Sequence, residues 1–437
     1  MLRKLVLAVP CVAGLAGLAL ANGRPPGTST INFRQGNDDE IAAGMTFGLL
    51  ISHDGGANWD YMCEDAVGYG GMYDPDYAYN STGSLAATTF DGAKIDRDMC
   101  TFGLTTLAPA APDIKFFSSI TLGPDHALYA AASNMGGDSK VYKSTDDGQT
   151  FPLSAQPAND GDWWQSIEVA PSNAQRVYLA GYRFQGSNPK TFLLFRSDNG
   201  GTSYQPLPIT DFTLMPNSTL EIAGISKTNP NLVFAVVRLE DNTIGDGLYV
   251  STNAGASFTH ILSVGAQISF VVRANGDIVA GTQNLGTQKS SNNGTSWSPV
   301  AGAPHINCLS ENSKGELWAC TQNFGNMSTP SDGFGIMKTT DLATWTGVLK
   351  FQDIRAPVAC PAGTPQHDKC DQQLWCGLCL QLGCDPKRPC PGFGADGAGD
   401  GLNVKRSTGC CDSGGGGLGA GALLGLMVGF VVLRRRR

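Results

Sequence analysis

Apolar residues along the chain gather in short runs that recur at similar intervals. The starts of successive runs lie 39 to 56 residues apart, about the length that one four-stranded blade of a β-propeller needs. Small residues are frequent in the runs, so we expect each run to be the inner strand of a blade, near a crowded central axis. The runs cover residues 41–44, 85–87, 128–131, 177–180, 233–236, 278–281 and 317–320.

A polar motif, Ser-x-Asp-x-Gly-x-Thr-aromatic, follows most of these runs, with Asn replacing Asp in several copies. Such a segment favours a hairpin turn, because the Asp or Asn oxygen accepts backbone N–H bonds and glycine adopts positive φ. The aromatic side chain would pack between neighbouring sheets. We therefore interpret these residues as structural rather than catalytic. The copies centre on Asp54 with Trp59, Asp146 with Phe151, Asn199 with Tyr204, Asn253 with Phe258, Asn292 with Trp297 and Asp341 with Trp345, and a degenerate copy lies at Asp98, Cys100 and Phe102.

These motifs resemble the Asp-box, or BNR repeat, of sialidases, sortilin-type receptors and several plant and bacterial propellers. Together with the seven runs, the resemblance implies an all-β chain with a seven-bladed β-propeller over residues 28–355. A six-bladed, sialidase-like propeller is the alternative if the degenerate second copy is an insertion. Because an open edge strand is a liability, we expect residues 31–33 to close the ring by pairing near residues 345–351.

Composition supports this fold class. The 437 residues include 56 Gly and 24 Pro, which suit turns and short strands better than long helices. Hydrophobic residues make up 41% of the chain, too many for a disordered protein. The net charge of −8 argues against nucleic acid as a partner.

Both ends of the chain have the composition of targeting segments. Residues 1–21 combine a basic start, a short apolar stretch and an Ala-x-Ala site, which is typical of a secretory signal. Residues 410–437 contain Cys410 and Cys411, an apolar stretch long enough to cross a membrane, and four terminal arginines. This end resembles the MYXO-CTERM sorting signal, which implies processing near the cysteines by an envelope protease and display on the outer surface. The alternative is a permanent inner-membrane anchor with a periplasmic propeller.

Export permits disulfides. Within the propeller, the most local pairing joins Cys63 to Cys100 and Cys308 to Cys320. Residues 356–391 hold six further cysteines, and we expect three disulfides to replace a hydrophobic core there. Residues 392–409 are Gly-rich and predict a flexible stalk. The chain has only 5 His and a single Cys-x-x-Cys pair in this segment, so we expect neither a metal site nor another cofactor.

Candidate ligand-binding residues lie where loops would gather on the face opposite the boxes. Several occupy one position relative to the apolar runs, and repeat symmetry would place them around the mouth of the central channel. Others are aromatic platforms for a sugar or peptide. Turn formation and packing are the structural alternatives. The candidates are Asn134, Trp163, Trp164, Arg183, Phe184, Asn284 and Asn323.

The inventory for catalysis is incomplete. Sialidases need three arginines and an Arg-Ile-Pro motif; the motif is absent, and Arg183, Arg238 and Arg273 are the nearest approach to the arginines. A glycosidase needs two facing carboxylates, and Asp162 with residues 240–241 offers candidates without an evident pair. We therefore expect an exported, surface-anchored and non-catalytic propeller that binds a glycan or protein partner. A sialidase-like or xyloglucanase-like glycoside hydrolase and an assembly factor are the alternatives.

Overall fold

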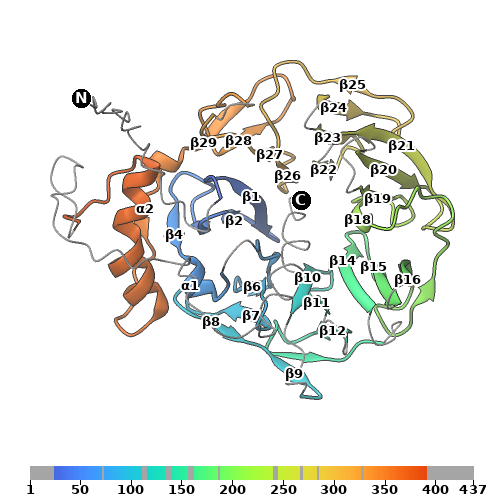
Figure 1. Cartoon of the computed structure of the whole chain (residues 1–437), viewed down its shortest axis with the longest axis horizontal. Helices are drawn as coiled ribbons and strands as arrows, with labels where there is room; N and C mark the ends of the chain where they lie inside the picture. Colours follow the sequence, from blue (N-terminus) through green and yellow to red (C-terminus); the bar gives the residue numbers. More distant parts are fainter. Residues whose placement is uncertain are drawn as a thin grey trace, which may run out of the picture.

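In the computed structural model, seven antiparallel blades are arranged around a central axis (Figure 1). Five blades are four-stranded sheets, blade 1 gains a fifth strand from the C-terminal part of the chain, and blade 3 has a three-stranded sheet with a short strand beside it. The structure describes residues 24–70, 73–110, 116–133, 139–155, 162–185, 188–239, 245–265, 269–282, 285–325 and 329–390. The predicted signal segment, the whole predicted stalk and the C-terminal sorting segment lie outside these residues. The chain is thus a seven-bladed propeller, and its second blade is a complete sheet rather than an insertion.

Each blade is formed by strands that follow one another in the sequence. Blades 1 and 2 contain β1 (Thr28–Arg34), β2 (Asn37–Met45), β3 (Gly48–Ser52) and β4 (Asp60–Met62), then β5 (Tyr77–Tyr79), β6 (Leu85–Thr88), β7 (Ala93–Asp96) and β8 (Phe102–Leu104). Blade 3 contains β10 (Phe117–Leu122), β11 (Leu128–Ala132) and β12 (Lys140–Ser144). Beside it, β13 (Thr150–Pro152) pairs in parallel with β9 (Thr106–Ala108), and an isolated bridge joins Leu153, just after β13, to Tyr142 of β12. Blade 4 contains β14 (Asp162–Ala170), β15 (Asn173–Gln185), β16 (Asn188–Ser197) and β17 (Gln205–Pro206).

The remaining blades repeat the same order. Blade 5 contains β18 (Thr219–Ile225), β19 (Val233–Arg238), β20 (Asp246–Ser251) and β21 (Thr259–Val264). Blade 6 contains β22 (Ser269–Val272), β23 (Ile278–Thr282), β24 (Gly286–Ser290) and β25 (Ser298–Pro299). Blade 7 contains β26 (Cys308–Glu311), β27 (Leu317–Cys320), β28 (Ile336–Thr339) and β29 (Thr346–Leu349).

The seven apolar runs are the second strands of the blades, not the inner strands that we expected. In blade 1, Ile41, Ala42 and Ala43 of β2 are all 0% exposed, and β2 is hydrogen-bonded to β1 on one side and β3 on the other. A second strand has a strand on either side and a neighbouring blade over each face, so it is the most fully buried. The innermost strands border the central channel and contain more polar residues.

The closure of the ring also differs from the prediction. β1 pairs with β2 as the innermost strand of blade 1, and β29 pairs with β28, so residues 31–33 do not pair with residues 345–351. Each blade is already complete in four consecutive strands, which leaves no strand to exchange. The chain after blade 7 instead runs over the seam, where β30 (Ala356–Pro357) pairs in parallel with β4 at the outer edge of blade 1.

Residues 356–390 form a strap that lies against the outside of blade 1, beside β4 (Figure 1). The strap follows the 3-10 helix η2 (Phe351–Asp353), and contains β30, the π-helix η3 (Gln366–Leu374) and α2 (Trp375–Leu382). The ring of Trp375, which is 0% exposed, lies 5.6 Å from that of Tyr61 in β4. The strap therefore shares the hydrophobic core of blade 1, and a separate disulfide-built module was the wrong expectation.

Disulfides fasten the strap to two blades. Cys63, at the N-terminus of the short helix α1 (Glu64–Val67), is bonded to Cys370, and Cys100 of blade 2 is bonded to Cys360. The predicted pair Cys63–Cys100 is therefore wrong, because the choice of the most local partner ignored how the strap folds back. The predicted pair Cys308–Cys320 is confirmed and joins opposite residues of β26 and β27. Within the strap, the bonds are Cys376–Cys390 and Cys379–Cys384.

Candidate binding site on the loop face

The antiparallel order gives the disc two chemically different faces. Turns between the first and second strands and between the third and fourth strands share one end of each blade, which we call the box face. Connections between the second and third strands lie at the other end, which we call the loop face. The Ser-x-Asp turns follow β3, β12, β16, β20, β24 and β28, so they lie on the box face.

The turns of the box face share one hydrogen-bond network. In blade 1, the Ser52 hydroxyl donates to Asp54 Oδ1 at 2.9 Å and accepts from Gly56 N–H at 2.9 Å. Asp54 Oδ1 also accepts from Asn58 N–H at 2.9 Å. Equivalent bonds recur after β12, β16, β20 and β24. The side chains of these turns are thus engaged in holding the backbone.

Blade 2 departs from this pattern because Asp96 stands where the other turns have Ser. Asp96 is 1% exposed and accepts the N–H of Asp98 through Oδ1 at 3.2 Å. Burial raises the pKa of Asp96 to about 6, and the bonds from the N–H groups of Asp98 and Met99 offset only part of that effect. This turn therefore places a titratable carboxyl inside the protein.

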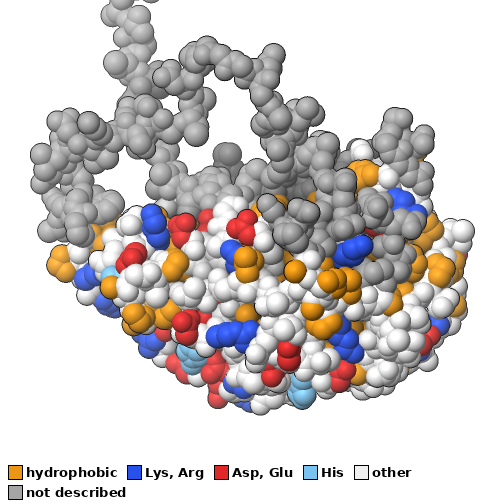
Figure 2. All heavy atoms as spheres, turned by 90° about the horizontal axis from the view of Figure 1, so that it is seen from below, with side chains coloured by type: hydrophobic (Ala, Val, Ile, Leu, Met, Phe, Trp, Pro, Cys, Tyr) orange, Lys and Arg blue, Asp and Glu red, His pale blue; other side chains and the backbone are white. Residues whose placement is uncertain are grey.

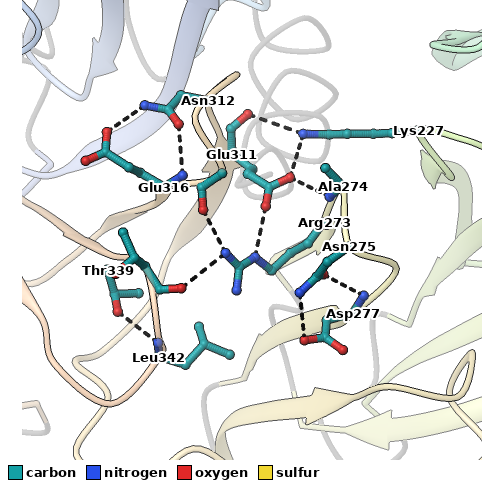
Figure 3. A network of polar contacts seen from close by, with 12 residues as sticks. Lys227, Arg273, Ala274, Asn275, Asp277, Glu311, Asn312, Glu316, Thr339 and Leu342 are labelled. Carbon is teal, nitrogen blue, oxygen red and sulfur yellow. Dashed lines mark hydrogen bonds and ion pairs between the residues drawn. The ribbon is translucent and has the colours of Figure 1, made fainter.

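A buried ion-pair network joins blades 5, 6 and 7 on the box face (Figure 3). The Glu311 carboxylate, 2% exposed, accepts from Lys227 Nζ at 2.7 Å, from Arg273 Nε at 2.9 Å and from Ala274 N–H at 2.7 Å. Arg273 also donates to the Gly315 carbonyl at 2.7 Å. Lys227 lies between β18 and β19, Arg273 and Ala274 lie between β22 and β23, and Glu311 ends β26, so the network fixes the three blades relative to one another.

The loop face is shaped by one long hairpin. β15 and β16 have 13 and 10 residues, whereas the second strands of the other blades have 4 to 9. Near its end, Phe184 is 51% exposed and packs edge-on against Tyr182, with ring centroids 5.1 Å apart. Lys190 Nζ lies 4.4 Å from the centre of the Tyr182 ring. The hairpin thus presents Phe184 toward solvent, with buried Tyr182 behind it and Lys190 over the Tyr182 ring.

Other predicted site residues have structural surroundings. Trp163 is 8% exposed and packs against Phe116 at 5.4 Å between ring centroids, and Trp164 is 0% exposed. Asn323 is 5% exposed, and its Oδ1 accepts the N–H of Phe351 at 3.0 Å, which attaches η2 to blade 7. These three side chains are therefore engaged in packing or in a hydrogen bond to the backbone. Asn134 and Asn284 lie outside the described residues.

The three arginines compared above with those of sialidases are Arg183, Arg238 and Arg273. Each is bound to carboxylates of the chain. Arg183 donates through Nε and Nη2 to buried Asp162, and Arg238 lies 3.1 Å from both Glu221 and Asp246. Although burial alone would lower the pKa of Arg238, these two carboxylates raise it. Arg273 is in the network on the opposite face. They therefore do not form a common site.

A cavity of about 210 Å³ lies on the central axis, between the innermost strands. Asp76, Glu168 and Glu221 line it together with Arg238, and so do Thr30 and Asn32 of β1. Sequence reasoning missed these carboxylates. The available signal was that Glu168 and Glu221 interrupt apolar stretches of two successive first strands. Asp76 accepts from Ser119 Oγ and Ile120 N–H at 3.1 Å, so part of this acidity stabilises the joint between blades 2 and 3.

The described residues contain neither a group of metal ligands nor a helix that could cross a membrane. No three His, Cys, Asp or Glu side chains among them lie close enough to hold a metal ion. None of their helices is long and apolar enough to span a bilayer. On the side of the molecule that Figure 2 shows, acidic, basic and hydrophobic side chains are interspersed over the described surface.

Comparison with known proteins finds similarity only among solved structures. No family model and no curated protein matches the sequence. Among solved structures, the GH74 enzyme of Niastella koreensis is 13% identical, with 76% of this chain and 66% of that chain covered and a TM-score of 0.42. The extracellular domain of a putative hybrid two-component system from B. thetaiotaomicron is 14% identical, with 68% and 37% covered and a TM-score of 0.46. YCF48 bound to D1 peptide is 13% identical, with 53% and 67% covered and a TM-score of 0.34. The chain is thus a seven-bladed propeller with structural neighbours among GH74 and YCF48 proteins, and it spans less than two thirds of the first two.

Proposed function

We propose that this protein is an exported, non-catalytic propeller that binds a glycan or protein partner through its loop face. The observation that carries the proposal is the long β15–β16 hairpin. An exposed Phe184 that is backed by Tyr182, with Lys190 over the same ring, offers apolar area and a cation at little conformational cost. Exposed aromatic side chains on projecting loops are typical of binding surfaces.

The occupied arginines and carboxylates favour binding over hydrolysis. A glycosidase needs one carboxyl that donates a proton and a second that faces it across the substrate. Asp162 is 0% exposed and is held by Arg183, while Glu221 and Asp246 share Arg238. These carboxylates are engaged in ion pairs with arginines of the chain, which suits a structural role.

Two further parts of the proposal are that the protein is exported and that it is an Asp-box propeller. Five disulfides among the described cysteines suit an oxidising compartment outside the cytoplasm. The recurring Ser-x-Asp turns support an Asp-box propeller. The composition of residues 410–437 supports sorting to the cell surface through Cys410 and Cys411, followed by removal of the apolar and arginine segments.

The binding function can be tested with glycan and peptide arrays. Purified full-length protein is applied to both arrays, and release of reducing ends from the bound glycans is measured in parallel. Phe184→Ala should weaken binding at least tenfold. Leu380→Ala is the matched control, because Leu380 is also exposed, at 39%, but lies on the strap. Release of reducing ends above the buffer rate, or equal binding by wild type and Phe184→Ala, would contradict the proposal.

Sorting can be tested by mass spectrometry of protein on the cell surface. We expect no peptide ending at Arg437 in that fraction, and we expect Cys410→Ser with Cys411→Ser to abolish surface display. Recovery of the intact C-terminal peptide from surface protein would show that the tail is a permanent membrane anchor.

A further inference from the structure

A pocket on the loop face of blade 5 results from a change in strand register. On β20 and β21, Gly247 lies opposite Ser263 and Tyr249 lies opposite His260, so Ile261 is an extra residue in β21. In a regular strand, residues 260 and 263 would point to opposite faces of the sheet. The bulge at Ile261 brings His260 and Ser263 to the same face as Tyr249. Bulges that re-aim side chains in this way are frequent beside functional sites.

Gly247 opens the pocket between these side chains. It lies two residues before Tyr249 on the same face, and a Cβ there would come within 3.0 Å of the Tyr249 ring and 3.4 Å of His260 Nε2. Val237 and Leu239 provide an apolar wall, and Thr213 closes the side toward blade 4. The resulting cavity has a volume of about 240 Å³, which is room for one small ring but not for a large ligand.

The polar groups of the pocket form a neutral set of donors and acceptors. His260 Nε2 and Ser263 Oγ are hydrogen-bonded at 3.0 Å. Burial lowers the pKa of His260, which favours the uncharged imidazole. Among the described residues that line the pocket, the single carboxylate is that of Asp246, which is balanced by Arg238 at 3.1 Å and accepts the N–H of Leu239 at 3.3 Å. This described lining thus lacks the excess charge that would select an anion or a cation.

The Tyr249 side chain is fixed in position. Its hydroxyl accepts the N–H of Thr213 at 3.0 Å, and its ring meets His260 edge-on with centroids 4.9 Å apart and Phe212 at 4.8 Å. A rigid aromatic wall beside paired hydroxyl and imidazole groups is suited to a ligand with one apolar face and several hydroxyl groups. Little side-chain entropy would be lost when such a ligand binds.

We propose that this pocket is a subsite for one uncharged hydroxylated ring, a single pyranose unit of a glycan. The inference rests on the proposed binding function of the loop face and names the ligand chemistry of one part of it. Ser263 and His260 donate to and accept from ring hydroxyls, and the apolar face of the sugar lies along Val237, Leu239 and Tyr249.

Saturation-transfer NMR can test the subsite with purified full-length protein and the methyl glycosides of glucose, galactose, mannose and xylose as probes. Ser263→Leu places a bulky apolar side chain at the pocket, and His260→Ala removes one hydrogen-bonding group. His305→Ala is the matched control, because His305 is also an exposed histidine but pairs with Asp332 of blade 7. At least one glycoside should give a signal that falls more than tenfold in Ser263→Leu and at least threefold in His260→Ala, and is unchanged in His305→Ala.

Thermal unfolding of each variant establishes that it is folded. If Ser263→Leu is unfolded, His260→Ala carries the test. The inference is overturned if none of the four glycosides gives a signal, or if the signal survives in the folded pocket variants. Phe184→Ala separates the two proposals: it should reduce binding to the arrays but leave the glycoside signal intact. Binding of peptides alone, sensitive to Phe184→Ala, would retain the loop-face function and refute the sugar subsite.

Discussion

Replacing Asp96 by Asn should change how the stability of the protein depends on pH. As the pH rises from acid to neutral, the difference in free energy of unfolding between variant and wild type should shift in favour of the variant. Asp96 is 1% exposed, and burial raises its pKa from 3.8 to about 6. Because the native state retains the proton more strongly than the unfolded chain, wild-type stability falls as the pH rises from about 4 to about 6. At about 1.4 kcal/mol for each pKa unit, ionised Asp96 costs roughly 3 kcal/mol above that range. An uncharged Asn avoids this cost.

The assay is urea denaturation of wild type and Asp96→Asn, with disulfides intact, at pH 4, 5, 6 and 7.5. The stability difference between variant and wild type should change by about 2–3 kcal/mol in favour of Asn between pH 4 and 7.5. Comparing two pH values cancels any constant effect of the amide group.

Asp146→Asn is the matched control from a standard turn. Burial alone would raise the pKa of Asp146, but bonds from the Thr150 hydroxyl and N–H, at 2.6 and 2.9 Å, lower it below 3.8. Its contribution to stability is therefore complete above about pH 5 and is lost as the pH falls below that value. The Asp146→Asn difference should be constant between pH 5 and 7.5, with only a small change between pH 4 and 5. Parallel curves for wild type and Asp96→Asn between pH 4 and 7.5 would refute the reasoning.

Three further predictions concern stability. Glu311→Gln should lower the free energy of unfolding by about 3 kcal/mol, because it leaves buried Arg273 and the partly exposed Lys227 without their counterion. Glu316→Gln, at a more exposed ion pair, should cost less than about 1 kcal/mol in the same denaturant titration. Removing the bond between Cys63 and Cys370 should lower the free energy of unfolding by about 4 kcal/mol while Cys100–Cys360 is intact, since Cys100–Cys360 already shortens the loop that Cys63–Cys370 closes. A loss below about 1 kcal/mol would show that the strap does not hold the ring. Trp297→Ala should cost about 3 kcal/mol by thermal unfolding, and array binding by the folded variant should be unchanged, because Trp297 is on the box face.

The blade count and the turns could be predicted because their signals are local. Each Ser-x-Asp turn forms most of its hydrogen bonds within five residues, as at Ser52 and Asp54. The sequence motif therefore contains nearly all the residues that determine the conformation of the turn. The order of strands within a blade was misjudged because apolar content reports burial, not distance from the axis. Residues 41–43 are fully buried in a second strand, where neighbouring blades cover both faces.

The disulfides and the candidate sites depended on contacts between distant segments. Nothing near Cys63 in the sequence indicates residue 370, which lies 307 positions away. The packing of Trp375 on Tyr61 and the pairing of β30 with β4 bring the two cysteines together. The pocket of blade 5 depends on a single extra residue at Ile261, which the alternation of residues in β21 does not reveal. Asp96, in contrast, could have been found from the sequence, since it replaces Ser in an otherwise recognisable turn.

The two disulfides that join the strap to the blades, Cys63–Cys370 and Cys100–Cys360, determine how the propeller bears mechanical load. Tension applied at Cys390 passes through its bond to Cys376, along η3 to Cys370, and then through sulfur to Cys63 in blade 1, with a second route from Cys360 to Cys100 in blade 2. β29 is paired with β28 by hydrogen bonds. It precedes Cys360 and Cys370 in the chain and therefore carries none of that force. A chain tethered from its C-terminal side therefore resists peeling from blade 7, and it yields only when covalent bonds break or blades 1 and 2 are pulled apart.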